Sequence, residues 1–230
     1  MADQFLEAIE NLSRFHREHE KFYAQRPREQ AVALQRHSRA LSALADRWEH
    51  VDAERVEALS PYQGADDLNA PGALQLDGIL FMEGDAEPAE ISAMIRELRT
   101  AGDGSVGTGT WLADAMENTW ATATILLEYE QLSDLVGDRH RIIANDWHAA
   151  SMSSLAGRVL QRAADVLDAI DFTPAAIRDD LDGTRRSPRL LHSAVELIDH
   201  AADLLSDSAG LVHDNERRWR TFHQRVIELS

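Results

Sequence analysis

The chain has 230 residues, with 40 acidic and 23 basic side chains, a formal net charge of −17 and no cysteine. A chain of this length can bury a sizeable core, in one large domain or two small ones. The lack of cysteine excludes disulfides, thiolate metal sites and cysteine nucleophiles. Hydrophobic residues make up 44% of the sequence, which predicts a globular rather than a disordered protein.

The sequence shows no sign of export or membrane insertion. Asp3, Glu7 and Glu10 give the N-terminal stretch the wrong charge for a signal peptide. The longest uncharged apolar stretch, 121–127, is far shorter than the ~20 residues that a membrane span needs. We therefore expect a cytoplasmic protein that does not associate with membranes.

The negative charge is concentrated in the middle of the chain. Residues 60–138 contain 15 acidic residues against only Arg96 and Arg99, a net charge of −13. Such a surface repels nucleic-acid phosphates, whose binding depends on neutralisation by lysine and arginine. It attracts cations or a basic protein surface instead.

Helical periodicity dominates the N-terminal part. Apolar residues at steps of three and four predict a first helix over 3–24. Pro27 stands where a helix can begin, and a second apolar stripe that ends at Trp48 predicts a helix over 27–50. A short helical turn is expected over 53–59. Proline and glycine then interrupt the pattern, and we expect residues 60–86 to form an irregular loop packed across the bundle.

The next segment reads as two helices, 87–100 and 111–127, separated by a glycine-rich break over 102–109. Residues 102–107 (GDGSVG) match the G-x-G-x-x-G pattern of dinucleotide-binding loops. That loop requires a preceding strand, and an amphipathic helix precedes it here. We therefore interpret 102–109 as a flexible loop between helices.

The C-terminal part is helical as well. After Gly137 the sequence predicts a long helix to Ile170, with a core stripe that we place at Ile143, His148, Met152, Leu155, Val159, Ala163, Val166 and Ile170. Thr173-Pro174 is typical of the start of a short helix, and Ser187-Pro188 of a last helix that continues to Leu229 and that Gly210 can bend or split.

These elements predict an all-α protein, an antiparallel bundle of six to seven substantial helices in a single domain, 1–230. The chain contains ten histidines. His16 and His19 are three residues apart and share a helix face. In a bundle, His148 and the carboxylate of Glu117 can approach that pair, and such a set suits Zn, Mn or Fe. The alternative is that each histidine is a hydrogen-bonded residue at the edge of the core.

Two further groups have ordinary structural interpretations. Trp111, Trp120, Trp147 and Trp219 occur at helical spacing, so we expect them to pack in the core, with the wall of a hydrophobic pocket as the alternative. The arginines near the C-terminus complement the negative end of the last helix, or pair with the acidic segment within one molecule or across a homodimer; they are Arg217, Arg218, Arg220 and Arg225.

No complete catalytic motif is present, and the sequence does not decide whether the chain is an enzyme. We predict a helical scaffold or regulatory interaction protein that uses its acidic surface to bind a basic protein surface or a second copy of itself. The alternative is a metal-dependent enzyme with a site inside the bundle, built from His16, His19, His148 and Glu117.

Overall fold

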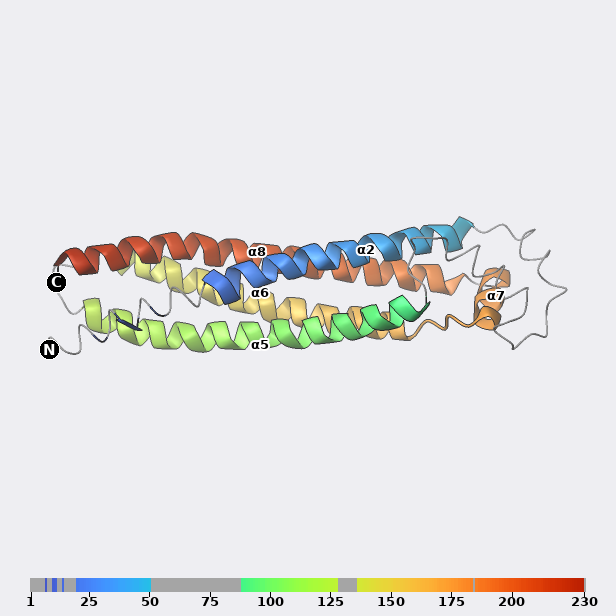
Figure 1. The fold of residues 1–230 in the computed structure, drawn as a ribbon, viewed down its shortest axis with the longest axis horizontal. Coiled ribbons are helices and arrows are strands. Elements are labelled where there is room, and N and C mark those ends of the chain that lie inside the picture. The colour runs from blue at the N-terminus through green and yellow to red at the C-terminus, as the bar shows by residue number, and fades with distance from the viewer. Residues whose placement is uncertain are drawn as a thin grey trace. The chain divides into compact units, whose positions relative to one another are not determined.

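The computed structural model describes residues 20–50, 88–127, 136–183 and 185–229, together with residues 7, 10, 11 and 14. These residues are almost entirely helical, and no strand occurs among them. The elements in chain order are a π-helix η1 (Glu20–Gln25) and the α-helices α2 (Arg26–His50), α5 (Pro88–Leu127), α6 (Val136–Asp168), α7 (Pro174–Asp182) and α8 (Arg186–Leu229). Figure 1 labels the α-helices.

The all-α prediction is confirmed for the described residues, and the described part holds fewer helices than the six to seven predicted. The structure has five α-helices in its described part, of which four are long. Most of the predicted helix 3–24, the turn 53–59 and the loop 60–86 lie outside the described residues. The last helix is not split at Gly210, because α8 is continuous from Arg186 to Leu229.

The predicted break at 102–109 is wrong, because α5 runs through it without interruption. Close packing against α6 explains the buried glycines there. A Cβ at Gly109 would collide with Ser154 Oγ and would lie 2.6 Å from the carbonyl oxygen of Ala150. On α6, a Cβ at Gly157 would lie 2.5 Å from the carbonyl oxygen of Gly102. Glycine therefore lets two helix backbones approach here, and this packing outweighs its low helix propensity.

Pro27 does not separate two helices, because η1 leads directly into α2. Proline has no backbone N–H, and its ring collides with the carbonyl group four residues earlier, which here belongs to Tyr23. A wider π-turn directly before the proline is the expected response to that clash. Pro27 is therefore the second residue of α2 (Arg26–His50), which confirms the helix predicted over 27–50 to within one residue, whereas the π-helix before it is not predicted.

Two compact units can be distinguished. Unit 1 comprises Met1–Val32, Gly102–Arg158 and Ala201–Ser230, and unit 2 comprises Ala33–Ala101 and Val159–His200. Within the described part, the four long helices each contribute residues to both units. Their buried residues recur at alternating steps of three and four, which is the spacing of coiled-coil-like bundles. The predicted single domain remains a prediction.

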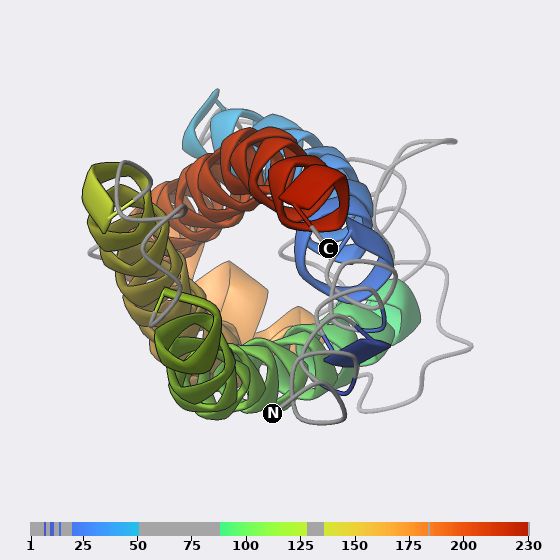
Figure 2. The same cartoon turned by 90° about the vertical axis from the view of Figure 1, so that its left-hand side faces the viewer.

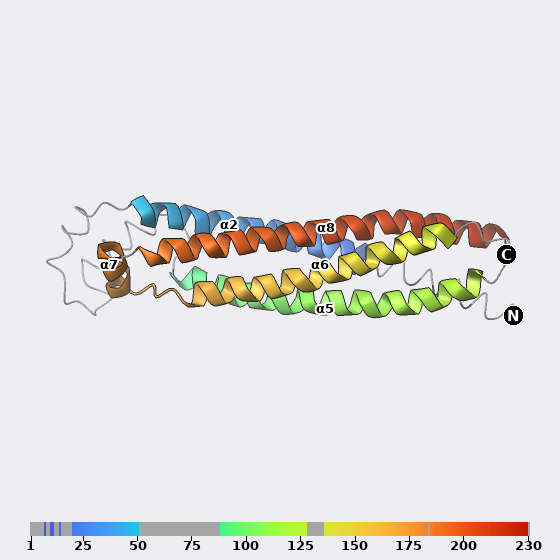
Figure 3. The same ribbon diagram turned by 180° about the vertical axis from the view of Figure 1, so that it is seen from behind.

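In unit 1, α6 packs against α5 on one side and α8 on the other (Figure 2). The contacts of Gly109 with Ala150 and of Gly157 with Gly102 make α5 and α6 antiparallel. Asn145 and Ser153 contact Asn215 and Ser208 in the reverse order, so α6 and α8 are antiparallel too, and Figure 3 shows them side by side. The end of η1 joins this core through an apolar cluster of Ala24, Leu112, Ala149, Ala150 and Val212.

Unit 2 has a larger apolar core. Its fully buried side chains include Leu41, Leu44 and Trp48 of α2, Ile91 and Leu98 of α5, Leu160 and Leu167 of α6, and Leu191 and Ile198 of α8. The α2 stripe that ends at Trp48 is therefore confirmed. Trp48 packs edge to face on Phe172, with 6.1 Å between the ring centroids. At the surface, Arg99 pairs with Asp168 at 2.9 Å and with Asp165 at 3.7 Å.

The predicted core stripe of α6 is wrong by one position along most of the helix. His148 and Leu155 are exposed, whereas Ala149, Ser153 and Ala156 are buried. Small side chains occupy the true core face, because α6 lies close to both of its neighbours in unit 1. A stripe drawn through the larger apolar residues therefore follows the wrong face.

The tryptophans divide between the core and the surface. Trp219 is buried against Phe222, as expected, with 5.5 Å between the ring centroids. Trp111 is 71% exposed and Trp147 is 50% exposed, so the core prediction is wrong for both. The side chain of Trp120 lies outside the described set.

The capping residue predicted from the sequence is confirmed for α7 but not for α8. Thr173 caps α7, as predicted, by accepting a hydrogen bond from the Ala176 N–H, and Pro174 follows in the first turn. At the start of α8, however, the carboxylate of Asp180 accepts hydrogen bonds from the N–H groups of Arg186 and Ser187. The cap of α8 therefore comes from α7 rather than from the residue before Pro188.

Candidate functional site

A polar cluster lies inside unit 1, between α6 and α8. Asn215 is fully buried, and its side-chain amide donates to Asp146 Oδ1 at 2.9 Å and to the Ile142 carbonyl oxygen at 2.7 Å. Asn145 donates in turn to Asn215 Oδ1 at 2.9 Å. These residues occupy core positions of the two helices, where an apolar side chain is the rule. A buried and satisfied polar pair of this kind fixes the register of neighbouring helices.

A second polar contact lies farther along the same two helices. The hydroxyl groups of Ser153 and Ser208 are 3.0 Å apart, and Ser208 also donates to the Ala149 carbonyl oxygen at 2.9 Å. Both serines are fully buried. Together with the Asn215 contacts, they add buried hydrogen bonds to the apolar contacts of the α6–α8 seam of unit 1.

Within this polar cluster, the fold changes the pKa of the Asp146 carboxyl group. Burial raises the pKa of its carboxyl group to about 7, and the hydrogen bond from Asn215 opposes that rise. The group therefore changes charge near neutral pH. Glu216, the residue after Asn215, is also buried, and it pairs with Arg220.

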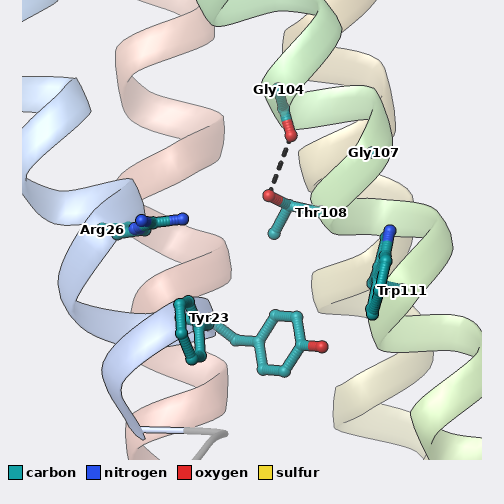
Figure 4. A pocket seen from close by; sticks show the side chains of 7 residues that line it. Tyr23, Arg26, Gly104, Gly107, Thr108 and Trp111 are labelled. Carbon is teal, nitrogen blue, oxygen red and sulfur yellow. Dashed lines mark hydrogen bonds between the residues drawn. The ribbon is translucent and has the colours of Figure 1, made fainter.

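An open groove lies on another side of unit 1, between the η1–α2 junction and α5 (Figure 4). It has a volume of about 530 Å³, which is within the usual range for small-molecule sites. Its lining combines aromatic rings, one cation and helix backbone, and the lining residues are Phe22, Tyr23, Arg26, Gly104, Gly107, Thr108 and Trp111.

The π-helix positions one wall of this groove. Phe22 and Tyr23 both belong to η1, and Arg26 is the first residue of α2. A π-turn holds one more residue than an α-turn and so shifts the side chains that follow around the helix, and such turns often occur at functional sites. The Arg26 guanidinium lies 5.0 Å from the centre of the Phe22 ring, and the Lys21 ammonium lies 5.7 Å from it.

The opposite wall comes from the glycine-rich part of α5. A Cβ at Gly104 or Gly107 would meet no atom of the described residues within 4 Å, so packing among those residues does not require glycine at either position. The Thr108 hydroxyl donates to the Gly104 carbonyl oxygen at 2.9 Å, which turns the threonine back onto its own helix. Trp111, one turn farther on, is largely exposed.

Comparison with known proteins gives no match. No protein-family model, curated protein or solved structure is significantly similar to this chain.

Helix α8 carries a third feature, an acidic face. Its three residues are exposed and belong to unit 1, and steps of four and seven residues place them on one side of the helix. They are Asp203, Asp207 and Asp214. Within the described part of the chain, none of the three has an ion-pair partner. We call this set the α8 acidic face.

The predicted metal ligands are only partly described. His148 on α6 and Glu117 on α5 are both exposed, whereas His16 and His19 lie outside the described residues. The described residues contain no group of three or more His, Asp or Glu side chains that could hold a metal ion. The metal site of the four predicted ligands therefore remains a prediction. No helix in the described part is both long and apolar enough to cross a bilayer.

Sequence reasoning missed the groove, although signals for it were present. The sequence pattern predicts a loop at Gly104 and Gly107 and a core position for Trp111. The signal for an open surface is the pair of glycines at seven and four residues before a tryptophan, on a side of the helix that is not fully buried. The alternative interpretation of Trp111 as the wall of a pocket agrees with its position (Figure 4).

Proposed function

We propose that this chain is a helical scaffold or regulatory interaction module that uses an acidic surface to bind a basic protein partner. The observation that carries the proposal is the α8 acidic face, because three exposed carboxylates line one side of one helix and none of them has an ion-pair partner in the described structure. Aligned unpaired charges repel one another in the free protein, and a basic partner relieves that repulsion.

The predicted acidic stretch, 60–138, supports the same proposal where it is described. On α5, Asp114 and Glu117 are exposed and have no ion-pair partner among the described residues. They add to the negative potential that steers a basic partner toward the protein. The proposal also includes one antiparallel bundle in the cytoplasm, both of which remain predictions from the sequence.

A second copy of the chain is the other partner that the charges allow. The acidic face of α8 is followed on the same helix by the exposed Arg217, Arg218, Arg220 and Arg225. Of these four, Arg220 pairs with Glu216, and Arg218 and Arg225 also have partners. We therefore commit to a separate basic partner and treat self-association as an outcome of the test.

Calorimetric titration with an arginine-rich peptide tests the proposal. The double variant Asp203→Asn/Asp207→Asn removes two charges from the α8 acidic face. The matched control, Asp165→Asn/Asp168→Asn, removes two exposed carboxylates that already pair with Arg99. We expect the first variant to weaken binding roughly two- to thirty-fold and the control to weaken it less, since each of the two ion pairs lost contributes ~0.2–1 kcal/mol.

Binding of the unaltered protein should also weaken steeply as salt is added, because salt screens exposed charges. Equal weakening by both variants would mean that the peptide senses only the net charge, and the α8 acidic face would then have no special role. A complex that persists unchanged at high ionic strength would refute electrostatic docking altogether. Sedimentation velocity of the protein alone, at the same salt concentrations, shows whether a second copy takes the partner's place.

A further inference from the structure

We propose that the groove of unit 1 is a binding site for a small planar aromatic carboxylate. Aromatic rings from η1 and α5 hold the ring system, and Arg26 pairs with the carboxylate. This site is separate from the α8 acidic face, and its test does not depend on the partner proposed above. Four observations support it, and they concern the glycines, the aromatic side chains, the cations and the π-helix.

The glycines of α5 provide the first observation. Gly102 and Gly109 are buried and Gly109 packs against α6, but Gly104 and Gly107 face open space on the groove side. Glycine inside a helix costs about 1 kcal/mol relative to alanine. Packing against the described residues does not explain why Gly104 and Gly107 are glycines. Their remaining effect on the structure is to keep side chains out of the groove. A flat ligand can then lie directly against the helix.

The aromatic residues provide the second observation. Trp111 is 71% exposed and Phe22 is 39% exposed, a large exposure for apolar side chains of this size. Tyr23 extends from η1 toward α5, opposite Trp111, so that rings stand on both sides of the space (Figure 4). Stacking of a planar ligand against these rings would bury their exposed faces.

The charged side chains around the groove indicate that the ligand is an anion rather than a cation. Three aromatic side chains can also form a cage for an organic cation. Here the Arg26 guanidinium and the Lys21 ammonium already lie on the Phe22 ring, so a cationic ligand would be repelled. Arg26 has no carboxylate partner among the described residues, and its planar guanidinium matches a carboxylate with two parallel hydrogen bonds. Figure 4 shows its side chain directed across the groove toward Thr108.

The π-helix provides the fourth observation. It is a local departure from α-geometry that ends two residues before Pro27, and both Phe22 and Tyr23 lie within it. Because of this departure, consecutive aromatic residues and Arg26 all line the same groove. This combination of an irregular helical turn and converging aromatic and cationic groups is typical of a ligand site.

Isothermal titration calorimetry with three probes tests the proposal. The first probe, 2-naphthoate, has both the ring system and the charge. The second, 2-naphthalenemethanol, lacks the charge, and the third, cyclohexanecarboxylate, lacks the aromatic face. We expect 2-naphthoate to bind at least tenfold more tightly than either of the others.

Two substitutions locate the binding. Gly107→Leu fills the groove from α5 without a clash, and Gly210→Leu is its control, because Gly210 of α8 also faces open space but does not line the groove. We expect Gly107→Leu and Arg26→Gln each to weaken 2-naphthoate binding about tenfold or more, and Gly210→Leu to leave it unchanged. Both leucine variants should fold, because each replaces a helical glycine at an unobstructed position.

Several results would overturn the proposal. One is equal binding of 2-naphthoate to the unaltered protein and to Gly107→Leu, which would place the ligand elsewhere. Another is binding of tetramethylammonium in preference to 2-naphthoate, which would make the groove a cation cage. Absence of binding by all three probes would also refute it. The Asp203→Asn/Asp207→Asn variant should bind 2-naphthoate as before, so failure of either proposal leaves the other intact.

Discussion

Asp146 illustrates how a single residue can couple this fold to pH. It occupies a core position of α6, where burial favours the neutral acid and Asn215 donates to its oxygen. The neighbouring buried acid, Glu216, is paired with Arg220. Asp146 is therefore the carboxyl group of the α6–α8 seam that we expect to change charge near neutral pH.

The pH dependence of stability follows from the direction of that change. The pKa of Asp146 is about 7 in the folded protein and 3.8 in the unfolded chain. Between these two values Asp146 holds a proton in the folded state that it has released in the unfolded state. The contribution of this group to the free energy of unfolding is therefore complete below about pH 4 and is lost as the pH rises through 7. The group accounts for a loss of up to roughly 4 kcal/mol over that interval.

Substitution Asp146→Asn should remove this slope, because asparagine stays neutral and keeps an oxygen that can accept from Asn215. At pH 8 we expect the variant to be more stable than the unaltered protein, and the two to converge near pH 4. Urea unfolding at a series of pH values measures the difference. Asp203→Asn, an exposed change of the same kind, should leave the slope as it is; a slope that survives in Asp146→Asn would show that Asp146 is not its source.

Residue types explain why part of the structure could not be predicted from the sequence. The core face of α6 in unit 1 is formed mainly by alanine, serine and glycine, together with Asp146 and one large apolar residue, Ile142. Larger apolar side chains such as Leu155 are on the exposed side. Hydrophobic periodicity gives most weight to large apolar residues, so it favoured the wrong face and placed His148 in the core. Close helix packing, which selects small residues, is a tertiary property that one sequence does not reveal.

At the scale of whole elements, the boundaries of α7 and α8 depend on hydrogen bonds from outside the regular helix. Arg185, between the two helices, has a φ of 47°, and its N–H donates to the Asp180 carbonyl oxygen at 3.1 Å. The carboxylate of Asp180 meanwhile caps the first N–H groups of α8. One residue at the end of α7 thus sets both the turn and the start of the longest helix.

Substitution Asp180→Ala should lower the free energy of unfolding by about 1 kcal/mol, because it leaves the N–H groups of Arg186 and Ser187 without their acceptor. Asp180→Asn keeps an oxygen at that position and should recover most of the loss. Urea unfolding measures both, and hydrogen exchange at the first turn of α8 should be faster only in the alanine variant. A loss of equal size in the asparagine variant would contradict a capping role.

Some elements were predictable because their signals are local. Thr173-Pro174 predicted the start of α7, and the α2 stripe ending at Trp48 was placed correctly, since large apolar residues form the core of unit 2. The sequence could not distinguish glycines that end a helix from glycines that pack inside one. For that reason the helix α5 was divided in two, and the groove beside it was missed.

At the scale of the whole molecule, the net charge and the folded core determine different surface properties. The net charge of −17 keeps the surface acidic, and the α8 acidic face concentrates part of that charge on one side of one helix. Within unit 1, by contrast, polar groups are buried and satisfied along the α6–α8 seam, and the groove is lined by a cation and aromatic rings. We therefore propose two binding surfaces of opposite charge, the α8 acidic face and the groove of unit 1.

The central claim is that residues 102–109 are helical, with some of their glycines packed against α6 and others facing the open groove. One pair of substitutions tests this claim most directly. Gly109→Ala places a methyl group against the backbone of Ala150, so it should destabilise the protein by about 1–3 kcal/mol. Gly107→Ala meets open space and should stabilise it by roughly 0.5–1 kcal/mol. Urea unfolding of both variants under the same conditions should therefore give changes of opposite sign, whereas two small changes of the same sign would contradict the claim.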